Sequence, residues 1–129
     1  MTTALLLIAH GSRNAEANDD LFHLMAALRQ RGPYPIVEAS FLELAEPDIL
    51  SGGQKCVAKG AGRVILLPYF LSPGVHVRQD LREFRTKLAH AFPGADFLLA
   101  EPLGRHEVLV DLVALRAREA EQGKPRDQP

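Results

Sequence analysis

The sequence has one cysteine, no tryptophan and almost no net charge. Because Cys56 has no second cysteine to pair with, an internal disulfide and a cysteine-rich zinc site are both excluded. The 15 basic and 16 acidic residues leave a net charge of −1, so charge gives no reason to expect a nucleic-acid or membrane partner. The first apolar run, residues 4–9, follows no basic segment and is far too short to span a bilayer. We therefore expect a cytoplasmic protein that binds neither nucleic acid nor membrane.

Several catalytic motifs are missing as well. The sequence contains no Gly-x-Ser-x-Gly elbow, no Walker loop, no Gly-x-Gly-x-x-Gly fingerprint and no His-Glu-x-x-His pair. Hydrophobic residues make up 47% of the chain and charged residues 24%, which is typical of one globular domain. We expect that domain at residues 1–120 and a disordered tail at residues 121–129, which are polar and carry two prolines.

Short apolar runs alternate with segments of helical spacing along the chain. The runs predict strands at residues 4–9, 36–41, 64–67 and 96–100, and the spacing predicts helices at 15–29, 47–59, 77–91 and 106–120. This alternation indicates an α/β fold, a four-stranded parallel sheet with helices on both faces. Right-handed crossovers make 2-1-3-4 the expected strand order, as in flavodoxin-like folds.

Two histidines follow the strands that this order places at the centre of the sheet. His10 comes directly after the first strand, and His76 follows the third strand after a loop that contains proline and glycine. Ligands of doubly wound sheets bind beyond the carboxyl ends of the strands, where the connections change direction. Neutral imidazoles are common ligands of late first-row metals. We predict that His10 and His76 share one metal site, although a structural or capping role for each histidine remains open.

Other polar side chains are expected on the same rim. Glu43 lies just past the second strand between leucines, where a carboxylate suits a general base, and its alternative is a solvated loop acid. Gly11 and Ser12 follow His10, and their backbone donors suit a modest anion cradle. His106 opens the last predicted helix, where we favour capping over metal ligation.

Arginines recur near both histidines. Arg13 stands beside His10, while Arg78, Arg82 and Arg85 are spaced to share one face of the helix after His76. Guanidinium groups around a crevice suit a ligand with several carboxylates. The alternative is a solvated helix face on which the arginines pair with Asp80 and Glu83.

Three segments together resemble a known family. The segments Leu-Ile-Ala-His10-Gly-Ser-Arg, Phe-Leu-Glu43 and Leu-Leu-Pro-Tyr-Phe-Leu-Ser-Pro-Gly-Val-His76 are similar to the signatures of the small sirohydrochlorin chelatases, which are ATP-independent class II chelatases. The third segment is long and specific. The resemblance implies a lyase that inserts a divalent metal into sirohydrochlorin, Co²⁺ foremost and Fe²⁺ or Ni²⁺ also possible, in cobalamin or sirohaem biosynthesis.

The resemblance also implies roles for individual residues. His10 and His76 would hold the incoming metal, and Glu43 would help to bind it or take protons from the pyrroles. Sirohydrochlorin carries eight carboxylates, which gives Ser12 and the arginine-lined rim a substrate-binding role. The metal is a substrate, no tightly bound cofactor is expected, and the short members of the family form homodimers.

Two other functions remain open from the sequence. One is a metal-binding carrier or chaperone of the same fold that performs no insertion. The other is a phosphohydrolase that uses His10 as its nucleophile, but histidine phosphatases place arginine directly before the histidine, and Ala9 stands there in this chain.

Overall fold

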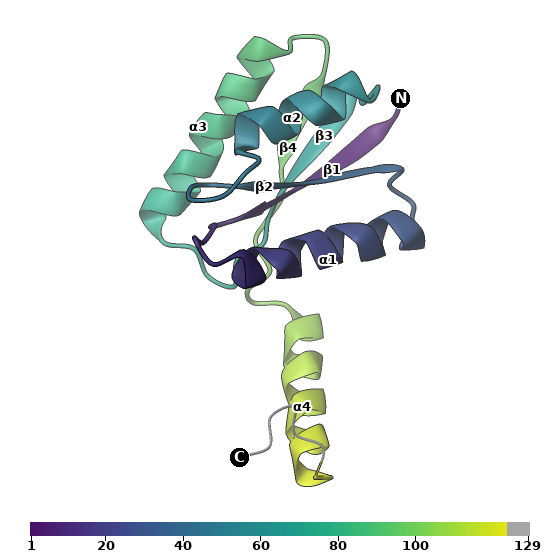
Figure 1. The fold of residues 1–129 in the computed structure, drawn as a ribbon, viewed down its shortest axis with the longest axis vertical. Coiled ribbons are helices and arrows are strands. Elements are labelled where there is room, and N and C mark those ends of the chain that lie inside the picture. Colours follow the sequence, from purple (N-terminus) through teal and green to yellow (C-terminus); the bar gives the residue numbers. More distant parts are fainter. Residues whose placement is uncertain (124–129) are drawn as a thin grey trace.

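Strands and helices alternate along the chain in the computed structural model, which describes residues 1–123 (Figure 1). They are β1 (Thr3–Ala9), α1 (Ala15–Arg31), β2 (Ile36–Phe41), α2 (Ile49–Ala58), β3 (Arg63–Pro68), α3 (Val75–Ala91), β4 (Asp96–Leu99) and α4 (Glu107–Glu121). The predicted tail begins within the last turn of α4, and its residues 124–129 lie outside the described residues.

All strand pairs are parallel, and the strand order is β2-β1-β3-β4. The predicted fold and strand order are therefore confirmed. β1 is central because its run from Ala4 to Ile8 is buried on both faces, as a continuous apolar strand of a parallel sheet must be. The carboxyl ends of β1, β2 and β3 consequently lie along one edge of the sheet.

Helices cover both faces of the sheet, but not evenly. α2 and α3 lie on one face and α1 on the other (Figure 1). The first face contributes Leu6, Val64, Leu66 and Phe97 to a core with Leu88 of α3. The second face carries a smaller core centred on β1 and β2, made of Leu5, Leu7, Leu21, Val37, Ala39 and Phe41.

One expectation about a helix needs correction. The second helix is predicted to begin at Pro47, but Asp48 is its N-cap and accepts a hydrogen bond from the Ser51 N–H at 2.8 Å, so α2 begins at Ile49.

The last helix, α4, projects away from the sheet, and none of its residues is buried (Figure 1). The expected capping role of His106 is confirmed, because its Nδ1 accepts the Val108 N–H at 3.1 Å.

Cys56 lies within the first core, near the buried carboxylate of Glu38. Burial raises the pKa of its thiol from 9.0 to about 12, and the negative charge of Glu38 contributes to that shift. Glu38 itself is bound by Arg29 at 3.1 Å and Lys59 at 2.5 Å. Because the folded protein holds the thiol proton more tightly than the unfolded chain, this group favours folding fully below pH 9 and progressively less as the pH rises towards 12.

We expect the thiol of Cys56 to be inert in the folded protein. The thiolate is the reactive species, and the side chain is both protonated at about pH 8 and fully inaccessible. A disulfide reagent that releases a coloured thiol should react with the native protein only as slowly as it unfolds, and stoichiometrically within minutes in denaturant. Rapid stoichiometric reaction in native buffer would contradict this placement.

Candidate functional site

The loops that follow β1 and β2 are joined by backbone hydrogen bonds. The Leu42 N–H donates to the Ala9 carbonyl at 3.0 Å, and the Glu43 N–H donates to the His10 carbonyl at 3.1 Å. The parallel ladder of β1 and β2 thus continues past the last strand residues. These bonds fix Glu43 beside His10, on the rim where the sequence predicted both.

His10 and Glu43 are in direct contact. The Nε2 atom of His10 lies 2.8 Å from Oε1 of Glu43, and the two side chains are 57% and 58% exposed. The leucines on either side of Glu43 leave its side chain more than half exposed, and Leu44 is itself exposed. A neutral imidazole that donates from Nε2 to a carboxylate presents the lone pair of Nδ1 to a metal ion. The carboxylate next to it is placed to accept a proton.

The loop that carries Glu43 is closed at its base. The Phe41 N–H donates to the Pro47 carbonyl at 2.9 Å, so five residues form the loop between them. Leu44 has a φ of 64°, a left-handed conformation that costs a non-glycine residue energy and persists only where the surroundings impose it. The position of Glu43 is therefore set by the fold.

Gly11 lies where the two loops approach most closely. Its φ is 100°, and a Cβ atom at this position would lie 1.8 Å from the Glu43 carbonyl oxygen. Only glycine fits both the conformation and the space. The contact between His10 and Glu43 thus depends on the residue that directly follows the histidine.

Ser12 serves the structure of its own loop. Its N–H donates to Oδ1 of Asn18 at 3.0 Å, its carbonyl accepts from Nδ2 of Asn18 at 2.8 Å, and its hydroxyl oxygen accepts the Asn14 N–H at 3.0 Å. The expectation of an anion cradle at Gly11 and Ser12 is wrong for one of its donors, because the Ser12 N–H already donates to Asn18. The role of Asn18 was not predicted, because a lone asparagine in a helical segment gives no signal of such a role. Arg13 is exposed beside this loop.

His10 and Glu43 form one wall of a cavity of about 320 Å³. The opposite wall comes from α3, which contributes Val77, Asp80, Glu83, Phe84 and Lys87. The sequence left Asp80 and Glu83 open as partners of the arginines, but within residues 1–123 no arginine pairs with either of them. They face the cavity instead. The sequence alone indicates that Asp80 and Glu83 share one face of a helix. The direction of that face depends on how α3 packs on the sheet.

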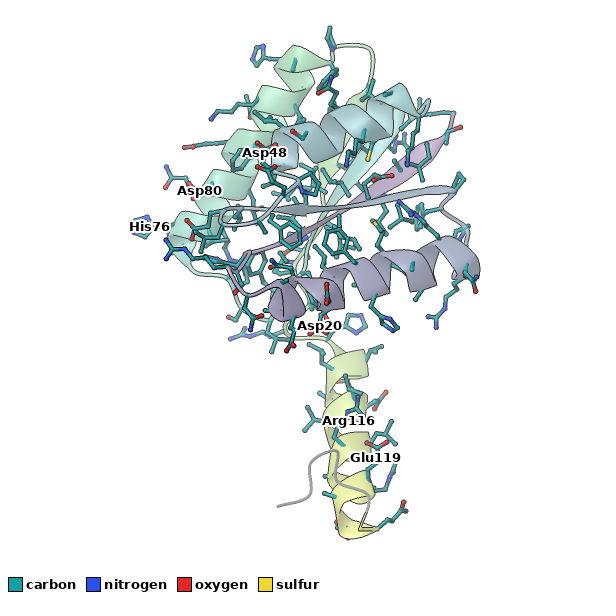
Figure 2. All side chains as sticks on the ribbon, viewed as in Figure 1. Asp20, Asp48, His76, Asp80, Arg116 and Glu119 are labelled. Atoms are coloured by element: carbon teal, nitrogen blue, oxygen red, sulfur yellow. The ribbon has the colours of Figure 1, made fainter. Side chains whose placement is uncertain are left out.

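His76 lies in the first turn of α3 and is exposed. Figure 2 shows it at the free end of the helix, one turn from Asp80, with which it shares a helix face. It does not line the cavity that His10 and Glu43 line. In the described part of the chain, no group of three or more His, Cys, Asp or Glu side chains is arranged to hold a metal ion. The structure thus brings Glu43 to His10, and the shared metal site of His10 and His76 stays a prediction.

Arg78 and Arg82 line a second cavity of about 220 Å³ near the ends of β3 and β4, together with Glu101. Nε of Arg78 donates to the Pro73 carbonyl at 3.3 Å. These arginines thus lie at a separate cavity from that of His10, and their role in binding a substrate stays a prediction.

Comparison with known proteins finds relatives that are all named sirohydrochlorin ferrochelatase or cobaltochelatase. Sirohydrochlorin ferrochelatase, chloroplastic, of Arabidopsis thaliana is 38% identical over 109 residues, covering 84% of this chain and 48% of that protein. Sirohydrochlorin ferrochelatase of Priestia megaterium is 33% identical, covering 96% and 47%. This chain therefore spans about half the length of these relatives. Sirohydrochlorin cobaltochelatase of Sulfolobus acidocaldarius is 29% identical, and 90% of each chain is covered.

Solved structures share the fold. SirB from Bacillus subtilis with Fe³⁺ superposes with a TM-score of 0.84 at 30% identity, covering 93% of this chain and 48% of that one. A cobalamin biosynthesis CbiX protein from Marinobacter aquaeolei superposes with a TM-score of 0.81 at 24% identity, covering 93% and 98%. In the part of the chain that the structure describes, no helix is long and apolar enough to cross a membrane.

The model of the CbiX family matches residues 4–120. This match includes β2, β3, β4, all of β1 except Thr3, and both loops that carry the contact between His10 and Glu43. The chain belongs to the CbiX family.

Proposed function

We propose that this protein inserts a divalent metal ion into sirohydrochlorin without ATP. The observation that carries the proposal is the contact of 2.8 Å between Nε2 of His10 and Oε1 of Glu43, at the carboxyl ends of adjacent strands. Both side chains remain more than half exposed, so a macrocycle has access to them. The activities in the names of the relatives support the same reaction.

Metal insertion requires a ligand that holds the ion without enclosing it. An imidazole from His10 and a second from His76 would bind the ion and leave coordination positions for the ring nitrogens, as a catalytic site must. Glu43 would then accept pyrrole protons as the nitrogens bind the metal. The carboxylates of Asp80 and Glu83 on the opposite wall of the cavity favour the approach of a cation.

The donor set accepts several metals. Imidazole and carboxylate ligands bind Co²⁺, Fe²⁺ and Ni²⁺, and selection among these ions often follows their availability. We propose Co²⁺ as the principal substrate and Fe²⁺ or Ni²⁺ as alternatives. The names of the relatives include both iron and cobalt enzymes.

Sirohydrochlorin is an acidic macrocycle, and we propose that Ser12, Arg13, Arg78 and Arg82 bind its carboxylates. Because Arg78 and Arg82 lie at a different cavity from His10, they would engage carboxylates at the periphery of the ring.

We further propose that the protein acts as a homodimer. The cytoplasmic location expected from the sequence stays a prediction.

The test is the visible absorption spectrum of metal-free sirohydrochlorin, mixed anaerobically with catalytic amounts of protein and with Co²⁺, Fe²⁺ or Ni²⁺ in turn. The proposal predicts that the spectrum converts faster than in a protein-free control for at least one metal. If no metal insertion is accelerated while the protein still binds Co²⁺, the protein is a carrier of the same fold. Conversion of only one molecule of sirohydrochlorin per molecule of protein would also contradict catalysis.

A further inference from the structure

The cavity beside His10 carries charges of both signs. Its acidic lining residues are Glu43, Asp80 and Glu83, and among the described residues that line it Lys87 is the only lysine or arginine. The acidic residues repel the carboxylates of a macrocycle such as sirohydrochlorin, and the ammonium group of Lys87 attracts them. A carboxylate of the substrate is therefore favoured in this cavity only at the position of Lys87.

An aromatic ring holds the ammonium group of Lys87, and no carboxylate within residues 1–123 forms an ion pair with it. The Nζ atom lies 5.4 Å from the centroid of the Phe84 ring, which is a cation–π contact. Glu83 lies one turn away on the same helix and does not pair with this lysine. Because the residue is also exposed, its charge is available to a carboxylate of a ligand.

The rest of the cavity lining suits the flat body of a tetrapyrrole. Leu42, Val77 and Phe84 form the apolar part of that lining, and all three are half-buried. Asp80 and Lys87 are seven residues apart on α3, so they lie on one side of the helix and about 10 Å apart along its axis. This separation is comparable with that between the centre of a tetrapyrrole and its peripheral carboxylates. A ring whose nitrogens face Asp80 would thus bring a carboxylate to Lys87.

Lys87 also connects this cavity with the arginines of α3. Lys87 and Glu83 line a third cavity of about 350 Å³, to which Arg82 contributes as well. Arg82 in turn lines the cavity that Arg78 lines. The cationic side chains of α3 therefore continue from the cavity of His10 to the arginines, and Lys87 is the member of this series that borders His10.

We propose that Lys87 is a substrate-binding residue that pairs with one peripheral carboxylate of sirohydrochlorin and so selects the edge of the macrocycle that enters the cavity of His10. Phe84 holds the ammonium group at the cavity and offers apolar surface to the ring. This inference rests on the proposed function, because it takes sirohydrochlorin as the ligand.

Binding of metal-free sirohydrochlorin tests this role without metal insertion. Titration of the full chain, followed by the fluorescence of the macrocycle, gives dissociation constants for wild type, Lys87→Gln and Lys87→Arg. Lys87→Gln should weaken binding about tenfold, because a charge-assisted hydrogen bond is lost. Lys87→Arg keeps the charge and should bind nearly as tightly as wild type. Wild-type affinity in Lys87→Gln would overturn the assignment.

Lys55→Gln is the matched control. Lys55 is an exposed lysine of α2 that makes no ion pair within the described residues and lines none of the three cavities. Its replacement removes the same charge from the protein and should leave the affinity for sirohydrochlorin unchanged. Equal losses in Lys55→Gln and Lys87→Gln would show an effect of overall charge and would overturn a specific role for Lys87.

Phe84→Leu tests the contact that holds the lysine. Leucine keeps an apolar side chain in the cavity and removes the ring beneath the ammonium group. The replacement should weaken binding of sirohydrochlorin in the wild-type chain and have a smaller effect in Lys87→Gln, where no ammonium group remains to be held. Effects that simply add would overturn the placement of Lys87 by Phe84.

The binding and spectral assays separate this inference from the proposed function. If sirohydrochlorin binds with the predicted order of affinities and no metal is inserted, Lys87 has the proposed role and metal insertion is wrong. If insertion is accelerated while Lys87→Gln binds as tightly as wild type, metal insertion is right and the role of Lys87 is wrong. A wild type that does not bind sirohydrochlorin overturns both.

Discussion

Replacement of Gly11 by alanine is expected to reduce the rate of metal insertion by at least about 100-fold. The added Cβ would lie 1.8 Å from the Glu43 carbonyl oxygen, in a residue whose φ is 100°. The two loops must separate to relieve this contact, which moves Glu43 from its place 2.8 Å from His10. Misplacement of a reacting group by about 1 Å is sufficient for a loss of this size. The initial rate of the spectral conversion of sirohydrochlorin measures it.

Gly60→Ala is the matched control for this variant. Gly60 has a φ of 101°, but no other atom lies within 4 Å of the position that a Cβ would occupy. Gly60→Ala therefore carries the same backbone strain without the steric contact, and we expect it to lower the free energy of unfolding by about 1 kcal/mol and to leave the insertion rate unchanged. Thermal unfolding followed by circular dichroism gives the stability of both variants. If Gly11→Ala inserted metal as fast as Gly60→Ala, close approach of the two loops would not matter for activity.

His10→Ala is expected to lose at least about 100-fold in insertion rate, and Glu43→Gln at least about tenfold. His10 supplies the proposed metal ligand, whereas glutamine keeps the shape of Glu43 but cannot accept a proton in the same way. Because the two side chains are in direct contact, their effects should not add, and the double variant should be little slower than His10→Ala.

The control for this pair is His23→Ala. His23 is an exposed histidine of α1, so its removal changes the histidine content of the protein without touching the cavity. Initial rates for the four variants at saturating Co²⁺ test the pair. Additive losses for His10→Ala and Glu43→Gln would show that the two residues act independently, and an unaffected His10→Ala would remove the histidine from the mechanism.

The parts of the fold that depend on local pattern could be predicted from the sequence. The continuous apolar run of β1 indicates a strand buried on both faces, and the alternation of strands and helices restricts the sheet to few topologies. The position of His10 and Glu43 on one rim follows from the order of the strands. Their direct contact was not predicted, because it depends on Gly11 allowing two backbones to approach, and neither spacing nor composition encodes that distance.

Features set by the rotation or docking of a helix could not be predicted. The orientation of Asp80 and Glu83 towards the cavity depends on how α3 lies on the sheet. The detachment of α4 was equally hidden, since an apolar helix face has the same sequence whether it packs on its own sheet or on another surface. The exposure of Val108, Leu112 and Leu115 could not be predicted from their spacing, because a covered helix face has the same spacing.

We propose that His10, which directly follows β1, and His76, in the first turn of α3, supply imidazoles to one site for metal insertion. The most direct test is the initial rate of Co²⁺ insertion into sirohydrochlorin by wild type, His76→Ala and His90→Ala, each corrected for the protein-free rate. Both histidines are exposed on α3, His76 in its first turn and His90 in its last. We predict that His76→Ala loses most of the acceleration and that His90→Ala retains it. Equal rates for the two variants would contradict a shared site of His10 and His76.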